Sequence, residues 1–391
     1  MDHEARIRIL QNAVRSNQLD GALLVYSRNI LYYTGTAQPS YLAVLPDDYA
    51  LFVRSGIEFA RREAAIDPGR IKEERKLAHV FRELFAGKKE AVKKIATELD
   101  VVTAEQFADM KRTFTGCDFV NVAPLTQEQR KTKDSGEIEK TRQACDAIHR
   151  GHEAVLATLR EGITELELSA AVENAHRLAG HEGIFFIRLP DFFMSRGPIS
   201  SGDNLFKISG VVYTITGVGL SPSVPAGPSR KKIAPGEPVI VDIPTLVDGY
   251  HADQTRTYCL GKAPAAVRSL YGDLKAVADH LIDRMKPGVR CSELYRMAVD
   301  KAEKLGRAGH FLNFGQGKRS RLIGHGIGLE LNEPPVVAEY EQGELDEGCL
   351  IALDMHMMDE AEGVVKLEDM ILVKNGGNEI LTKSPRELIE V

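Results

Sequence analysis

Hydrophobic and polar positions follow two different periods in the first third of the chain. Residues 4 to 18 carry apolar side chains at helical spacing, which predicts an amphipathic helix. Three short apolar runs between turn residues follow, as is typical of strands: GALLVYS, YLAVLP and YALFV. The charged stretch that ends in KKEAVKKIATEL predicts further helices, and FVNVAPL predicts a last strand. This alternation indicates an α/β domain.

The polar segment QEQRKTKDSGEIEK separates this region from a long helix that carries apolar residues at Ile138, Ala144, Ile148 and Val155. We place a domain boundary near Thr126, which gives domains of residues 1–126 and 127–391. A chain of 391 residues exceeds the size at which a single core keeps growing, so two domains are expected.

Two segments of the second domain echo each other. In LREGITELELSAAV and MKPGVRCSELYRMAV, a Glu-Leu pair follows Gly162 and Gly288 at the same offsets. Each segment follows one predicted helix and begins another. Joints between a glycine and a helix are common, so the echo alone carries little weight.

A β-rich stretch, VDIPTLVDGYHADQTRTY, contains two acids, Asp242 and Asp253, that lie eleven residues apart. One uninterrupted strand would point them to opposite faces. However, Asp248-Gly249 between hydrophobic segments is a hairpin signal, and it folds the second strand back beside the first. We therefore expect the two carboxylates to converge.

The same arrangement recurs near the end of the chain. LIALD and VVKLED flank a short loop that contains Glu362-Gly363, so Asp354 and Glu368 converge in turn. Between the two acidic pairs, GHGIG places His325 among glycines that allow close backbone approach.

These five residues predict a dinuclear metal site assembled from separate strands. Oxygen ligands plus one imidazole suit Mn, Zn, Co or Fe, and bridging carboxylates can hold two ions close enough to share a water. A metal-bound hydroxide is the implied nucleophile. The alternative is that the acids cap turns and pair with Arg256 or Lys366. For any one acid that interpretation is preferable, but the order of all five favours the metal site.

Several segments resemble the pita-bread metallopeptidases, which include methionine aminopeptidase, aminopeptidase P, prolidase and the metal-free creatinase. They are VDIPTLVDGYHADQTRTY, GHGIGLELNEPP, GCLIALD and GVVKLEDMILV, and RKTKDSGEIEKTRQACDAI and RNILYYTGT are similar to the prolidase and aminopeptidase P branch. The resemblance spans nearly the whole chain. It implies an α/β (α+β) fold, with a non-catalytic creatinase-like α/β domain before a pseudo-twofold pita-bread domain.

The resemblance also implies roles for the five ligands. Asp242 would hold one ion, Asp253 and Glu368 would bridge, and His325 with Asp354 would complete the other. The implied reaction is hydrolysis of the N-terminal C–N bond of a short peptide, as in Xaa-Pro peptidases, with a small amide as another possible substrate. Glu368 or Asp354 would carry the proton.

Three positions depart from the pattern of that branch. A Glu-Pro-Gly is replaced by Asp354-Met355-His356, which shortens the acid and puts His356 two residues on, where an extended strand would give it the same face. His356 is either an extra ligand or proton carrier, or a hydrogen-bonded histidine past the strand end. Asn332 stands where the branch has a proton-shuttling histidine, and Pro225 stands near the place of another.

These departures bear on the rate of the reaction. The amide of Asn332 can orient a substrate carbonyl but cannot exchange protons near neutral pH. Each missing imidazole would cost on the order of 10²-fold in rate if nothing replaces it. A creatinase-like enzyme, a lyase on the same scaffold, and a binding module without turnover therefore stay open as alternatives.

The segment that precedes the first acidic pair contains Arg188 and Arg196, the nearby arginines able to grip a substrate carboxylate with two hydrogen bonds. The alternative for either arginine is a solvated surface position.

Composition narrows the environment and the partners. The formal charge of −6 argues against a nucleic-acid groove. No apolar run is long enough to cross a bilayer, and the start MDHEARIRIL is charged, so we expect no membrane association. The five cysteines are scattered without CxxC spacing, which suggests reduced thiols in the cytoplasm. The resemblance suggests a homodimer.

Overall fold

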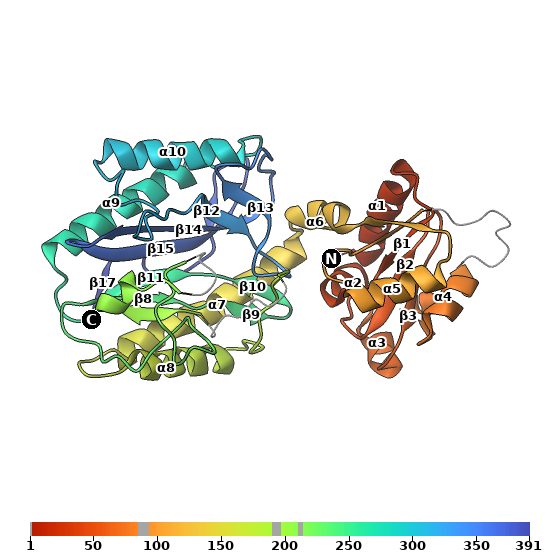
Figure 1. The fold of residues 1–391 in the computed structure, drawn as a ribbon, viewed down its shortest axis with the longest axis horizontal. Coiled ribbons are helices and arrows are strands. Elements are labelled where there is room, and N and C mark those ends of the chain that lie inside the picture. Colours follow the sequence, from red (N-terminus) through yellow and green to blue (C-terminus); the bar gives the residue numbers. More distant parts are fainter. Residues whose placement is uncertain (1, 85–93, 190–196, 210–213) are drawn as a thin grey trace. The chain divides into compact units, whose positions relative to one another are not determined.

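The computed structural model describes residues 2–84, 94–189, 197–209 and 214–391 (Figure 1). The chain forms two compact units, Met1–Arg130 and Lys131–Val391. Thr126 lies inside helix α6 (Ala123–Lys131), and the boundary at Thr126 stays a prediction.

The first unit contains a six-stranded sheet, and its helices precede or connect strands of that sheet in the sequence. The strand order is β4-β3-β2-β1-β5-β6. The helices before α6 are α1 (His3–Ser16), α2 (Ser27–Thr34), α3 (Ile57–Glu63), the short η1 (Pro68–Arg70), α4 (Leu77–Leu84) and α5 (Ala104–Thr113). The strands are β1 (Gly21–Leu24), β2 (Ser40–Val44), β3 (Tyr49–Val53), β4 (Ile71–Glu73), β5 (Lys94–Thr97) and β6 (Asp118–Asn121).

Most elements expected in this unit are confirmed. Helix α1 occupies the predicted amphipathic segment, and β1, β2, β3 and β6 lie in the four predicted strand segments. The charged stretch contains helix α4, as expected, and also strand β4, and its residues 85–93 lie outside the described residues. Its end, Lys94–Thr97, forms strand β5 rather than a helix. This strand pairs in parallel with β1 and β6, and Ile95, Ala96 and Thr97 are all buried. A short run buried on both faces is typical of a parallel strand.

The second unit is built on a nine-stranded sheet whose main order is β13-β12-β14-β15-β11-β8-β7. Its strands are β7 (Ile199–Ser201), β8 (Pro238–Asp242), β11 (Thr255–Cys259), β12 (Leu322–Gly326), β13 (Glu333–Ala338), β14 (Leu350–Asp359), β15 (Gly363–Leu372), β16 (Glu379–Ile380) and β17 (Ile389–Glu390). A separate hairpin pairs β9 (Thr245–Val247) with β10 (Tyr250–Ala252). The helices are α7 (Ser135–Thr158), α8 (Glu165–Leu178), the short η2 (Gly202–Phe206), α9 (Ala265–Ile282) and α10 (Cys291–Lys304).

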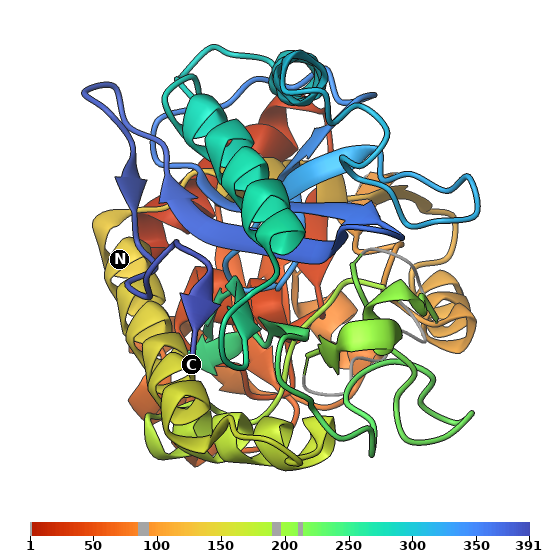
Figure 2. The ribbon, with the colours of Figure 1, turned by 90° about the vertical axis from the view of Figure 1, so that its left-hand side faces the viewer.

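Strand β14 has an apolar face and a mixed face, as the period-2 rule requires. Leu353 and Met355 pack into the core that includes α9 and α10. Ala352 faces the other way, into a core shared with α7. Helices α9 and α10 therefore lie against one face of the sheet and α7 against the other (Figures 1 and 2).

The two similar sequence segments around Gly162 and Gly288 form matching turns between helices. Gly162 lies between α7 and α8 with φ of 79°, and Gly288 lies between α9 and α10 with φ of 85°. In both joints the helix begins three residues after the glycine. A left-handed conformation at these turns favours glycine, which explains why the same residue recurs.

Two properties expected from composition can be compared with the structure. All five cysteines are buried. Across residues 2–84, 94–189, 197–209 and 214–391, no helix is both long and apolar enough to span a membrane.

Helices α7 and α8 touch at a glycine and a histidine. A Cβ atom at Gly151 would lie 2.0 Å from Nε2 of His176, so only glycine fits beneath this ring. Burial lowers the pKa of His176 to about 4, helped by the nearby His181. The ring is therefore neutral near neutral pH.

This lowered pKa predicts a pH-dependent stability. Below about pH 6.5 the unfolded chain takes up a proton at His176 but the folded chain does not, so the stabilisation is lost as the pH falls toward 4. We expect His176 to contribute a loss of about 2 kcal/mol in unfolding free energy as the pH falls from about 7.5 to about 5. Urea unfolding of the wild type and of His176→Gln measures this contribution. An identical pH dependence in the two proteins would contradict it.

Candidate metal centre

A cavity of about 330 Å³ in the second unit contains all five predicted ligands. Its lining includes Asp242, Asp253, His325, Asp354 and Glu368, together with Arg188, Thr214, Asn332, Tyr340 and Lys366. The cavity lies within the range of small-ligand pockets, about 300–1,000 Å³.

The predicted hairpin at Asp248-Gly249 is present, but it joins β9 to β10 and does not itself pair the strand that carries Asp242 with the segment that carries Asp253. Asp248 and Gly249 form the turn between β9 and β10 with φ of 47° and 79°. These values suit the two-residue turn that Asp-Gly favours. The strand that pairs with β8 is β11 rather than β10, and Asp242 lies opposite Thr255. Asp253 precedes β11 and so lies near the end of β8.

The second acidic pair lies on a long hairpin. Strands β14 and β15 are antiparallel, and Asp354 is directly opposite Glu368. Directly paired residues on one face have close Cβ atoms, so both carboxylates enter the cavity. The predicted convergence of Asp354 and Glu368 is confirmed.

Three of the five side chains form a compact donor set. One ligand atom each from Asp253, His325 and Glu368 lies within 4.8 Å of the others, and all three residues are buried. Nδ1 of His325 donates to the carbonyl of Gly326 at 3.1 Å, which leaves Nε2 as the lone-pair nitrogen of the neutral ring. Burial lowers the pKa of His325, which keeps the ring neutral. Two carboxylates and a neutral imidazole suit one divalent transition-metal ion.

A lysine lies among three of the four acids. Nζ of Lys366 lies 2.5 Å from Oδ2 of Asp242, 3.2 Å from Oδ1 of Asp354 and 3.8 Å from Oε2 of Glu368. Its side chain is 1% exposed. The alternative interpretation from sequence, in which Lys366 pairs with these acids, is therefore correct for Lys366. Its position two residues before Glu368 on the same strand was the available signal.

The charges in the cavity shift one another's pKa values. Burial raises the pKa of Asp354 to about 6, against the opposing effect of Lys366. Burial and neighbouring acids also raise the pKa values of Asp253 and Glu368. Burial alone would lower the pKa of Lys366, but the carboxylates outweigh it and the pKa rises. The lysine is thus an ammonium group in a cavity with excess acid.

Thr214 is a cavity residue that the sequence did not reveal. Its Oγ1 donates to Oδ2 of Asp242 at 2.9 Å, and Nζ of Lys366 donates to Oγ1 at 2.6 Å. The same carboxylate oxygen of Asp242 is therefore engaged by two groups. Thr214 lies in a loop far along the chain from the acids, and no periodic pattern points to it.

The other candidate catalytic residues lie in different surroundings. Asn332 is exposed and lines the cavity. Nε2 of His356 donates to the carbonyl of Asn313 at 3.0 Å, and its ring stacks on Phe314 at 4.4 Å. Burial lowers the pKa of His356 to about 3. The ring is therefore neutral near neutral pH and does not take up a further proton there. His356 and the half-buried Pro225 are outside the described cavity lining.

Arg188 lines the cavity with a side chain that is 7% exposed, so the solvated-surface interpretation is wrong for it. Its Nη1 lies 3.8 Å from Oε2 of Glu330. Arg196 lies outside the described residues.

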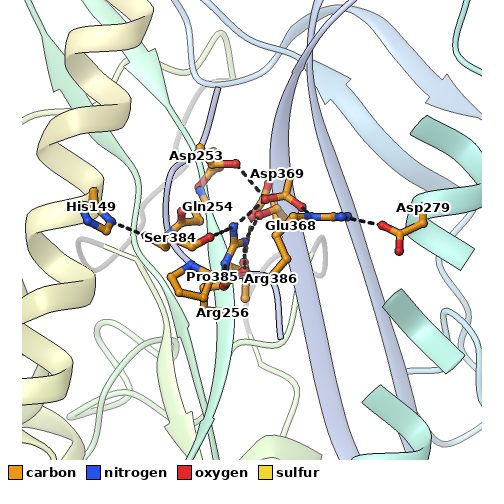
Figure 3. A network of polar contacts seen from close by, with 12 residues as sticks. His149, Asp253, Gln254, Arg256, Asp279, Glu368, Asp369, Ser384, Pro385 and Arg386 are labelled. Atoms are coloured by element: carbon orange, nitrogen blue, oxygen red, sulfur yellow. Dashed lines mark hydrogen bonds and ion pairs between the residues drawn. The ribbon is translucent and has the colours of Figure 1, made fainter. Parts of the chain in front are cut away.

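A charged network supports β15 from the face opposite the cavity. Arg256 donates to the carbonyl of Glu368 at 2.6 Å and to Oδ1 of Asp369 at 2.6 Å. Arg386 binds the other oxygen of Asp369 and reaches Asp279 on α9 (Figure 3). Because Glu368 and Asp369 are adjacent on a strand, the network fixes the strand while Glu368 points into the cavity. Arg256 pairs with Asp369 rather than with any of the five predicted ligands.

The sheet with helices on both faces and a carboxylate-lined cavity is the pita-bread architecture, here preceded by a creatinase-type α/β domain. Residues 139–375 match metallopeptidase family M24, and residues 6–132 match the creatinase/prolidase N-terminal domain. The first match covers more than half of the chain, so the chain belongs to metallopeptidase family M24. The resemblance, the fold class and the assignment as an M24 hydrolase are confirmed.

Individual relatives agree with this assignment. The chain is 25% identical over 392 residues to an Xaa-Pro dipeptidase of Pyrococcus furiosus, with 98% of this chain and 99% of that protein covered. The solved Xaa-Pro dipeptidase of Bacillus anthracis superposes with a TM-score of 0.83 at 23% identity over the full length of both chains. The prolidase of Pyrococcus horikoshii gives 0.80 at 24% identity, with 98% of this chain and 100% of that chain covered. The two structures establish the fold.

The buried network predicts a large effect of one substitution. Arg256→Met leaves Asp369 with fewer partners and removes the donor to the carbonyl of Glu368, so we expect a loss of about 3–5 kcal/mol in unfolding free energy. Chemical denaturation measures this loss. Arg150→Met is the matched control, since Arg150 forms an exposed pair with Glu153 at 2.8 Å and such pairs contribute little. Equal effects in the two variants would contradict the prediction.

Proposed function

We propose that this protein is a metal-dependent hydrolase that cleaves the N-terminal C–N bond of short peptides of the Xaa-Pro type. The observation that carries the proposal is the buried donor set of Asp253, His325 and Glu368 inside a cavity of small-ligand size. Family membership and full-length similarity to an Xaa-Pro dipeptidase support the same reaction.

The donor set fits one divalent ion, with Asp253, His325 and Glu368 as its ligands. When bound, such an ion acts as a Lewis acid that polarises a carbonyl and lowers the pKa of water. The assignment of two ions, drawn from Mn, Zn, Co or Fe, also requires Asp242. Oδ2 of Asp242 already accepts a hydrogen bond from Thr214 and pairs with Lys366.

The chain's own residues supply the rest of the chemistry. In this proposal Glu368 or Asp354 accepts a proton from the attacking water and passes it to the leaving nitrogen. The amide of Asn332 orients the substrate carbonyl from the cavity wall. The guanidinium of Arg188 favours a substrate that ends in a carboxylate. His356 supports the strand through Asn313 and Phe314.

The remaining properties are part of the same proposal. Residues 1–126 form a non-catalytic domain and residues 127–391 carry the reaction. The resemblance to the prolidase branch favours a homodimer. The buried cysteines and the absence of CxxC spacing are consistent with a reducing cytoplasm.

The direct test is hydrolysis of Xaa-Pro dipeptides after loading with manganese. We expect release of the free amino acid by the wild type, and a loss of at least about 10²-fold in Asp253→Ala because a metal ligand is removed. Asp283→Ala is the control, since Asp283 is an exposed acid at the end of α9. Metal binding without release of amino acid would favour a lyase. If the protein neither binds metal nor releases amino acid, a binding module is favoured.

The amide at Asn332 leads to a second prediction. A histidine at this exposed position of the cavity wall would restore a group that exchanges protons near pH 7, so Asn332→His should raise kcat by about 10-fold or more. Asn332→Gln controls for side-chain size. The pH profile of kcat tests the mechanism, because only the histidine variant should gain a dependence near the pKa of an imidazole. No gain in rate would show that the proton is handled elsewhere.

A further inference from the structure

The cavity contains a cation site that the chain fills by itself. Resting on the proposed metal-dependent function, we infer that the ammonium group of Lys366 takes the place of the ion that Asp242 would otherwise hold. The protein then binds one divalent ion, at Asp253, His325 and Glu368, instead of two.

The distances around Lys366 carry the first step. Nζ lies 2.5 Å from Oδ2 of Asp242, which is a short, charge-assisted hydrogen bond. Asp354 and Glu368 complete the surroundings at 3.2 and 3.8 Å. The ammonium is therefore held by three acids, two of which the family resemblance assigns to different ions.

The strand register explains why the lysine cannot easily leave. Lys366 and Glu368 lie on the same face of β15, and Lys366 is paired with His356 on β14. The His356 ring is held by Asn313 and Phe314. The side chain of Lys366 is 1% exposed and lies on a ten-residue strand, so it is enclosed among the cavity acids.

Thr214 makes this arrangement specific for an ammonium group. Its Oγ1 accepts from Nζ of Lys366 and donates to the same oxygen of Asp242. An ammonium is a donor with no acceptor capacity, so a hydroxyl and carboxylates satisfy it well. A divalent ion at the same place would face the like charge of Lys366 at close range.

The other half of the cavity is different. The ligand atoms of Asp253, His325 and Glu368 lie within 4.8 Å of one another. Nδ1 of His325 is used by Gly326, so Nε2 remains for an ion. Glu368 belongs to both halves, which couples the ammonium to the ion through one carboxylate.

The test counts ions. Wild type and Lys366→Met are dialysed against excess manganese, and bound ions per chain are measured by elemental analysis and calorimetry. We expect one ion in the wild type and two in Lys366→Met, because removing the ammonium frees Asp242 and leaves the acids without a counter-charge. Lys133→Met is the matched control, since Lys133 is an equally buried lysine, paired with Glu333 at 2.9 Å outside the cavity lining.

Lys366→Gln is the second variant, in case the methionine protein does not fold. Glutamine removes the charge that repels an ion beside Asp242, so we expect it to gain a second ion as well. The wild type alone also decides the question, because electron paramagnetic resonance spectra of bound manganese distinguish an isolated ion from a spin-coupled pair.

Each outcome has a separate meaning. Two ions in the wild type, or a coupled manganese spectrum, would overturn the inference and leave the proposed hydrolase intact. One ion in wild type and in both Lys366 variants would overturn it in the same way. No ion in any protein would overturn the proposed function itself.

Discussion

The structure of the active cavity depends on how buried carboxylates are neutralised. Asp242, Asp253, Asp354 and Glu368 are placed in one cavity, and removing a charge from water costs several kcal/mol unless a partner repays it. The chain supplies a single ammonium from Lys366. Among the described lining residues, the cationic side chains are Lys366 and Arg188, and Arg188 lies 3.8 Å from Glu330. The four acids therefore still exceed the positive charge, and the excess lies where His325 stands beside Asp253 and Glu368.

The two faces of strand β15 contact different groups: one face lines the cavity and the other contacts the arginine network. Lys366 and Glu368 point into the cavity, whereas Asp369 points to the other side and is held by Arg256 and Arg386 (Figure 3). The network also binds the backbone oxygen of Glu368. A carboxylate that must contact both an ammonium and a metal ion is thus placed on a backbone that is itself fixed from behind.

The sequence predicted the elements that local rules govern. Asp248-Gly249 and the loop before Gly363 specified two hairpins, and the period of 2 put Asp354 and Glu368 on one face. The same rule also put Lys366 on that face. It could not decide whether the acids pair with Lys366 or bind a metal ion. The sequence did not predict two features that depend on contacts between distant segments. Thr214 comes from a distant loop, and strand β5 follows from parallel pairing with β1 and β6 rather than from its own charged context.

Anomalous diffraction at the manganese edge, from crystals grown with excess manganese, tests the central claim most directly. The account predicts one peak per chain, bound by Asp253, His325 and Glu368, with Nζ of Lys366 still beside Asp242. Two peaks bridged by Asp253 and Glu368, with the lysine displaced, would contradict it.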